Sequence, residues 1–168
     1  MKSVSPVGVG LTYAMFVLAA SMASAQVSDT VVAPNETVIL SAHAEGAQIY
    51  DCTNADGKLV WRFREPIATL LIDGKTVGRH FAGPSWELAD GSSVTAKIAA
   101  RAAGSTAKDI PLLKLEVVSR HGMGQLTGIT TVQRLNTKGG VVEGPCESTG
   151  AFLSVPYSAD YVFLKKGG

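Results

Sequence analysis

The sequence has few cysteines and almost no net charge, and each shortage excludes a class of protein. The 15 Lys and Arg residues stand against 14 Asp and Glu, which leaves a net charge of +1. This balance lacks the basic surface of a nucleic-acid binder. Its two cysteines, Cys52 and Cys146, show none of the short paired spacings of structural zinc sites. We therefore expect neither a nucleic-acid partner nor a zinc-stabilised fold.

Long apolar runs are also missing. The longest, residues 7–20, has about 14 residues, whereas a helix needs roughly 20 to span a bilayer. It follows Lys2 and precedes Ala-Ser-Ala at residues 23–25, a small-x-small cleavage pattern. These features predict a secretory signal peptide over residues 1–25, cleaved after Ala25. The mature chain, residues 26–168, is then a secreted or periplasmic single β domain with no transmembrane segment.

Helical periodicity is absent as well. After residue 25, short runs of β-branched and aromatic residues alternate with Gly, Pro, Asn and Asp clusters. We expect seven to nine strands in an antiparallel β-sandwich or barrel of the jelly-roll kind, with a core over residues 46–164 and at most short helical turns. The expected strands are 47–52, 58–63, 66–72, 76–82, 93–101, 110–119, 124–137 and 152–165, the last interrupted at Pro156.

Two cysteines in an exported chain favour one disulfide between Cys52 and Cys146. The bridge would close a long loop and, in the chain-entropy model, stabilise the fold by about 4.5 kcal/mol. The competing arrangement places both thiolates with His80 and His121 around a metal. Because none of the histidines shares a strand face by spacing, we predict no metal site.

The segment His80–Val94, HFAGPSWELADGSSV, concentrates the reactive side chains. His80 with Glu87 or Asp90 forms a candidate acid–base pair, since a carboxylate orients an imidazole and raises its pKa. The alternative is a structural loop, in which Trp86 caps the core, Asp90 closes a turn and His80 bonds the backbone. Ser85 lacks the following glycine and helix of a nucleophile elbow.

Strand alternation places further candidate binding residues. Arg134 and Asn136 are expected on one side of their strand, and Ile98 and Arg101 on opposite faces of theirs. An arginine on a mostly apolar face usually pairs with an acid, here Glu116 or Asp160, and anion binding is its rarer use. The segment His121–Gly128 resembles a dinucleotide fingerprint but leads into a strand, so we expect no cofactor.

Several longer motifs resemble a known family. The segments GAQIYDC, WRFREPIATL, GRHFAGPSWELADGSSVTAK and GMGQLTGITTVQRLNTKGG are similar to those of a secreted family of bacteria and fungi, domain of unknown function 3455. The similarity runs from Gly46 to about Phe163. It implies a single exported domain with Cys52 and Cys146 paired, and it carries no established activity.

Three functions remain open. The first is a non-catalytic ligand-binding or surface-associated domain for a carbohydrate or small metabolite, because rings with polar tips stack on sugars in concave sites. Core filling is the alternative use of those rings. The second is a secreted hydrolase that uses His80 with Glu87 or Asp90. The third is a structural envelope or matrix protein. The candidate binding residues are His80, Trp86, Arg134, Asn136 and Tyr157.

Overall fold

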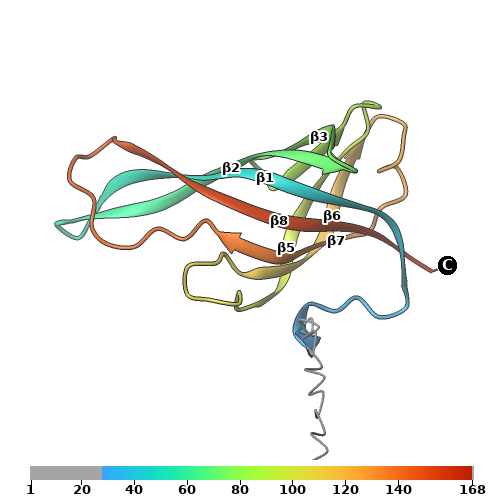
Figure 1. The fold of residues 1–168 in the computed structure, drawn as a ribbon, viewed down its shortest axis with the longest axis horizontal. Helices are drawn as coiled ribbons and strands as arrows, with labels where there is room; N and C mark the ends of the chain where they lie inside the picture. The colour runs from blue at the N-terminus through green and yellow to red at the C-terminus, as the bar shows by residue number, and fades with distance from the viewer. Residues whose placement is uncertain (1–27, 168) are drawn as a thin grey trace, which may run out of the picture.

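Eight antiparallel strands form the molecule (Figure 1). The computed structural model describes residues 28–167, so the predicted signal peptide lies outside the described residues. A short 3-10 helix, η1 (Asp29–Val31), precedes the first strand. The strands are β1 (Glu36–Ala55), β2 (Lys58–Ile72), β3 (Lys75–Phe81), β4 (Ser85–Leu88), β5 (Ser93–Ala102), β6 (Leu112–His121), β7 (Thr131–Gly139) and β8 (Phe152–Lys166).

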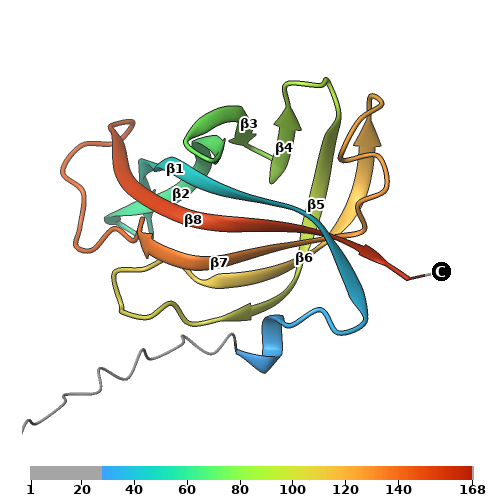
Figure 2. The ribbon, with the colours of Figure 1, turned by 45° about the vertical axis from the view of Figure 1, so that its right-hand side comes forward.

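The strands close into one barrel. Each strand pairs with the next in the chain, and β1 pairs with β8 over most of its length, from Glu36 to Asp51. Figure 2 shows β1 and β8 crossing the barrel side by side. The prediction of an antiparallel all-β fold is confirmed. Of the two architectures expected, the barrel is the one formed, and its strands follow chain order in an up-and-down arrangement rather than a jelly roll.

Two prolines lie inside their strands. The sequence predicted that Pro66 begins a strand and that Pro156 interrupts one, and both predictions are wrong. Pro66 lies inside β2, before the first residue that pairs with β3, Ala68. Pro156 lies inside β8, next to Tyr157, the last residue that pairs with β7. Proline has no N–H to donate, so a strand accepts it at a position that has no neighbouring strand on one side. Each strand therefore continues through its proline.

Residues 124–130, predicted as strand, instead form a loop that closes one end of the barrel. Leu126 and Ile129 in this loop are fully buried in the core cluster. The carboxylate of Asp90, in the turn between β4 and β5, accepts a hydrogen bond from the backbone N–H of Gln125 at 2.9 Å. The Oγ of Ser92 in the same turn accepts from the N–H of Leu126 at 3.2 Å. These bonds hold the closing loop against the barrel.

The predicted disulfide between Cys52 and Cys146 is confirmed. The two Cα atoms lie 5.8 Å apart, and the bridge joins residues separated by 94 positions in the chain. It ties the far end of β1 to the connection between β7 and β8. Within the described residues, we find no helix with the length and apolarity needed to cross a bilayer.

Candidate functional site

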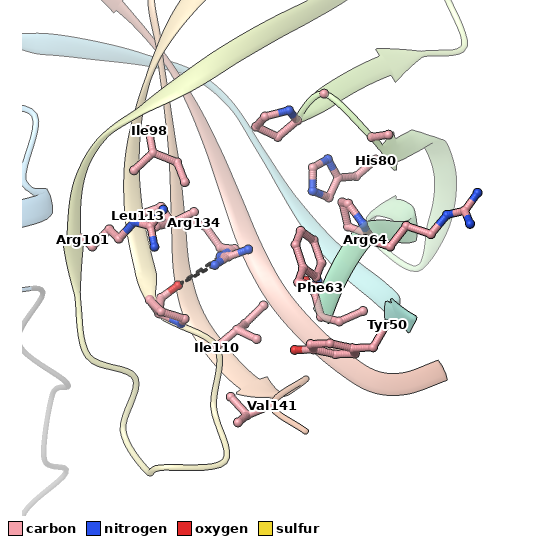
Figure 3. A pocket seen from close by; sticks show the side chains of 16 residues that line it. Tyr50, Phe63, Arg64, His80, Ile98, Arg101, Ile110, Leu113, Arg134 and Val141 are labelled. Atoms are coloured by element: carbon pink, nitrogen blue, oxygen red, sulfur yellow. Dashed lines mark hydrogen bonds between the residues drawn. The ribbon is translucent and has the colours of Figure 1, made fainter. Parts of the chain in front are cut away.

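The end of the barrel opposite the closing loop contains a cavity of about 380 Å³ (Figure 3). Strands β1, β2, β3, β5, β6 and β7 all contribute to its wall, together with the β3–β4 turn. The side chains are mostly apolar or aromatic, with arginines among them. The lining residues are Gln48, Tyr50, Phe63, Arg64, Pro66, His80, Ala82, Gly83, Pro84, Ile98, Arg101, Ile110, Pro111, Leu113, Arg134 and Val141.

Irregularities in the strand pairing decide which residues face this cavity. The β1–β2 register shifts between Ile49 and Tyr50, which leaves Arg64 as an extra residue in β2. The β5–β6 register shifts between Ile98 and Ala100, so that Ile98 and Arg101 both line the cavity. Strict alternation placed those two side chains on opposite faces, and that prediction is wrong. A bulge re-aims the side chains that follow it, which a period-2 pattern does not anticipate.

His80, on β3, forms part of the inner cavity wall and is only 2% exposed. Its ring stacks on Trp86 with centroids 4.6 Å apart and meets Tyr161 at 4.8 Å. Because the Ser85 carbonyl at 2.8 Å can only accept, His80 Nδ1 must donate, which leaves Nε2 as the acceptor. Burial lowers the pKa of His80 to about 3; the Ser85 bond opposes this shift and the charge of Arg134 adds to it. His80 is therefore neutral near pH 7.

The structure does not bring Glu87 or Asp90 to His80. Glu87 follows Trp86 on β4, so its side chain takes the other face of the sheet, where it accepts a hydrogen bond from Arg79 at 2.8 Å. Asp90 lies in the turn at the far end of β4. Hydrogen bonds from the Ser92 hydroxyl, and next from the Gln125 backbone, lower the pKa of the Asp90 carboxyl. Both carboxylates thus have structural partners of their own.

Trp86 and Tyr157 belong to the core beneath the cavity. Trp86 is 1% exposed and packs edge-on against Tyr161 and Phe163, at 5.3 and 6.1 Å. Its Nε1 has no hydrogen-bond partner among residues 28–167. The Tyr157 hydroxyl lies 3.4 Å from that of Tyr161, and burial, followed by the neighbouring Tyr161, raises the pKa of Tyr157. These rings are placed to fill the barrel.

Arg134 points into the cavity from β7 without an acidic partner. Its Nε and Nη2 both donate to the Pro111 carbonyl, at 3.0 and 2.9 Å (Figure 3). Within residues 28–167, no carboxylate lies within 4.0 Å of the guanidinium. The predicted partners bind elsewhere, since Glu116 is 3.5 Å from Lys97 and Asp160 is 2.7 Å from His43. The expected acid pairing of Arg134 is wrong.

Asn136 lies on the outside of the barrel, away from Arg134. The β7–β8 register shifts after Leu135, and Asn136 adopts a positive φ of 50°. Its amide donates to Asp160 at 2.7 Å, on the outer surface. The alternation that placed Asn136 beside Arg134 ends at this irregularity.

Two lining residues on β1 were not among the sequence candidates. Gln48 is 3% exposed, and its Nε2 has no hydrogen-bond partner among residues 28–167. Tyr50 donates its hydroxyl hydrogen to the Gly140 carbonyl at 2.7 Å. The only hint in the sequence was that Gln48 stands between apolar neighbours in a strand. A polar side chain buried at such a position needs a hydrogen-bond partner.

Together these features define a class: an eight-stranded up-and-down barrel, closed at one end by a loop and opening at the other into a mostly apolar cavity with arginine side chains in its wall. Residues 32–74 and 72–165 match the family described as "Protein of unknown function (DUF3455)", and the chain belongs to this family. No curated protein and no solved structure matches the chain.

Proposed function

We propose that this chain is an exported binding protein that holds a small, largely apolar molecule in the open end of the barrel. The observation that carries the proposal is the cavity of about 380 Å³, lined by residues from six strands. Small-molecule sites are typically concave and mostly apolar, with volumes of about 300–1,000 Å³ and a few polar groups that orient the ligand. The cavity fits each of these features.

The surroundings of the cavity support binding. The closing loop seals the other end of the barrel with Leu126 and Ile129, so an occupant enters and leaves at one end. The stacked rings of His80 and Trp86 give the cavity a rigid inner wall. A rigid, preformed wall reduces the entropy lost when a ligand binds.

The chemistry at His80 favours binding over hydrolysis. With a pKa of about 3, the imidazole is a much weaker base than the near-neutral group that acid–base catalysis uses. Glu87 and Asp90 are engaged with Arg79 and with the closing loop. In the neutral state, His80 Nε2 can accept one hydrogen bond from an occupant.

Export is the second part of the proposal. It is supported by the apolar leader and cleavage pattern in residues 1–25. The Cys52–Cys146 disulfide is consistent with it, because such bonds persist in oxidising compartments. Expression of the full chain, followed by N-terminal sequencing of the exported form, should give a mature chain that begins at Gln26.

Binding can be tested with a neutral fluorescent probe, N-phenyl-1-naphthylamine. The mature protein should enhance its fluorescence saturably, and Ile98→Trp should reduce binding at least tenfold because the larger ring occupies the cavity mouth. Ile98 is 40% exposed and should accept this change without loss of folding. The matched control is Val118→Trp on the next strand, where the 56% exposed side chain does not line the cavity. Absence of saturable binding, or equal binding by both variants, would overturn the proposal.

A further inference from the structure

We propose that the occupant of the cavity is a monocarboxylic acid, bound through its carboxylate to the free edge of the Arg134 guanidinium. This inference rests on the proposed binding function and names the chemical class of the ligand. Its apolar body would lie against the wall formed by Ile98, Leu113 and Val141.

The hydrogen bonds of Arg134 leave one edge of the guanidinium available. Nε and one hydrogen of Nη2 are directed to the Pro111 carbonyl, which fixes the plane of the group. The remaining hydrogen of Nη2 and one hydrogen of Nη1 form the end-on fork, and this fork matches the two oxygens of a carboxylate. Arg134 is therefore oriented by the Pro111 carbonyl and also lies close to the Tyr161 hydroxyl. No carboxylate among residues 28–167 takes its remaining donors, which a ligand carboxylate can accept.

The charges around the cavity also select an anion. Three arginines, Arg64, Arg101 and Arg134, line it, and no Asp or Glu does. Arg64 has its own partners, with Nε 3.0 Å from the Glu65 carboxylate and the guanidinium 5.0 Å above the Phe152 ring. A partly buried cation without a carboxylate partner is costly unless a ligand supplies the counter-charge. Arg101 is exposed to solvent, which screens its charge, so Arg134 is the partly buried cation without a carboxylate partner among residues 28–167.

Gln48 supplies a second donor. It is 3% exposed, and its Nε2 is unpartnered within residues 28–167. The terminal torsion of a glutamine is broad and roughly two-fold, so a turn of the amide presents Nε2 to the cavity. A buried donor without a partner costs about 1–3 kcal/mol. A ligand oxygen that draws Nε2 toward the cavity would give this donor a partner.

The cavity size limits the ligand to a short molecule. At ~30 Å³ for each water, its volume corresponds to about a dozen waters. A medium-chain fatty acid, or one aromatic ring with a short acidic side chain, fits this space. We favour a carboxylate over a phosphate because Arg134 is the one lining arginine that is neither exposed, as Arg101 is, nor paired with a carboxylate, as Arg64 is, and one guanidinium balances one negative charge and not two.

The test compares octanoate, octanamide and octyl phosphate as competitors of N-phenyl-1-naphthylamine at pH 7. Octanoate should bind about 10- to 100-fold more tightly than octanamide, because hydrogen bonds to charged groups are the stronger ones. Arg134→Gln should abolish this preference, because octanoate binding loses its charge-assisted hydrogen bonds and falls far more than octanamide binding does. The matched control Arg79→Gln, at an outward-facing and 65% exposed side chain, should keep the preference.

Arg134→Gln also removes the bonds to Pro111, so Gln48→Met provides a second variant of similar volume. It should reduce octanoate binding severalfold without weakening the binding of N-phenyl-1-naphthylamine, which has no oxygen to accept the Gln48 hydrogen bond. Equal binding of octanoate and octanamide by the wild-type protein would overturn the carboxylate inference, as would tighter binding of octyl phosphate. In either case the binding function itself would stand, because it is contradicted only by failure of the neutral probe to bind or by equal probe binding of Ile98→Trp and Val118→Trp.

Discussion

His80 should make the stability of this protein fall between pH 7 and pH 4.5. In the unfolded chain its pKa is about 6.5, and burial lowers the pKa in the folded state to about 3. Between these values the unfolded state binds one more proton than the folded state. The free energy of unfolding therefore decreases as the pH falls below 6.5, and the loss is complete only below the folded pKa.

The size of the effect follows from the same two values. Each pH unit in this window changes the free energy of unfolding by about 1.36 kcal/mol for one group. From pH 7 to pH 4.5, His80 should contribute a loss of about 2.5 kcal/mol. Hydrogen bonds lower the pKa values of the Asp90 and Asp109 carboxyls below 3.8, so their stabilisation is lost mainly at more acidic pH.

Urea unfolding of the oxidised protein at several pH values measures this loss. The variant His80→Gln has no titrating group at this position. Between pH 7 and pH 4.5, its free energy of unfolding should therefore fall by about 2.5 kcal/mol less than that of the wild type, whatever its value at pH 7. The control is His121→Gln, whose exposed ring bonds Ser119, and it should behave as the wild type. If His80→Gln lost as much stability as the wild type over this range, the reasoning from burial would be wrong.

Two further predictions concern the barrel framework. Replacing Cys52 and Cys146 together by serine should lower the free energy of unfolding by about 4.5 kcal/mol, the value that the chain-entropy model gives for the 94-residue separation. Urea unfolding of this variant and of the oxidised wild type measures the difference. An unchanged midpoint would contradict the prediction. Gly46→Ala should cost about 2–4 kcal/mol, because its Cβ would lie 2.1 Å from the Ile67 carbonyl oxygen on β2. The control Gly57→Ala has no atom within 4 Å of its Cβ and should cost about 1 kcal/mol through its φ of +81° alone, so equal costs would refute the steric argument.

The candidate site was only partly predictable from the sequence. His80 and Arg134 were named as binding candidates, and both line the cavity. Trp86 and Tyr157 were named for their rings but fill the core, since a ring with a polar tip serves either use and only its surroundings decide. Gln48 was missed because one polar residue in a strand is not distinctive until its neighbours are known.

Local chemistry was enough to determine the fold class and the disulfide. Alternating apolar residues between turn-forming glycines and prolines produce antiparallel strands wherever they occur. Two cysteines in a chain with a predicted export signal have only each other to pair with. These properties depend on neighbouring residues or on simple counts, so the sequence alone was sufficient.

Tertiary structure decided what the strands enclose. The bulges at Arg64 and after Ile98 change which side chains line the cavity, against the alternation of the sequence. Burial among rings from β4 and β8 keeps His80 neutral. The Arg134 guanidinium is held by the Pro111 carbonyl and not by a carboxylate, which leaves donors for a ligand. Each of these features depends on groups far apart in the chain, whose distances are set only when the barrel closes.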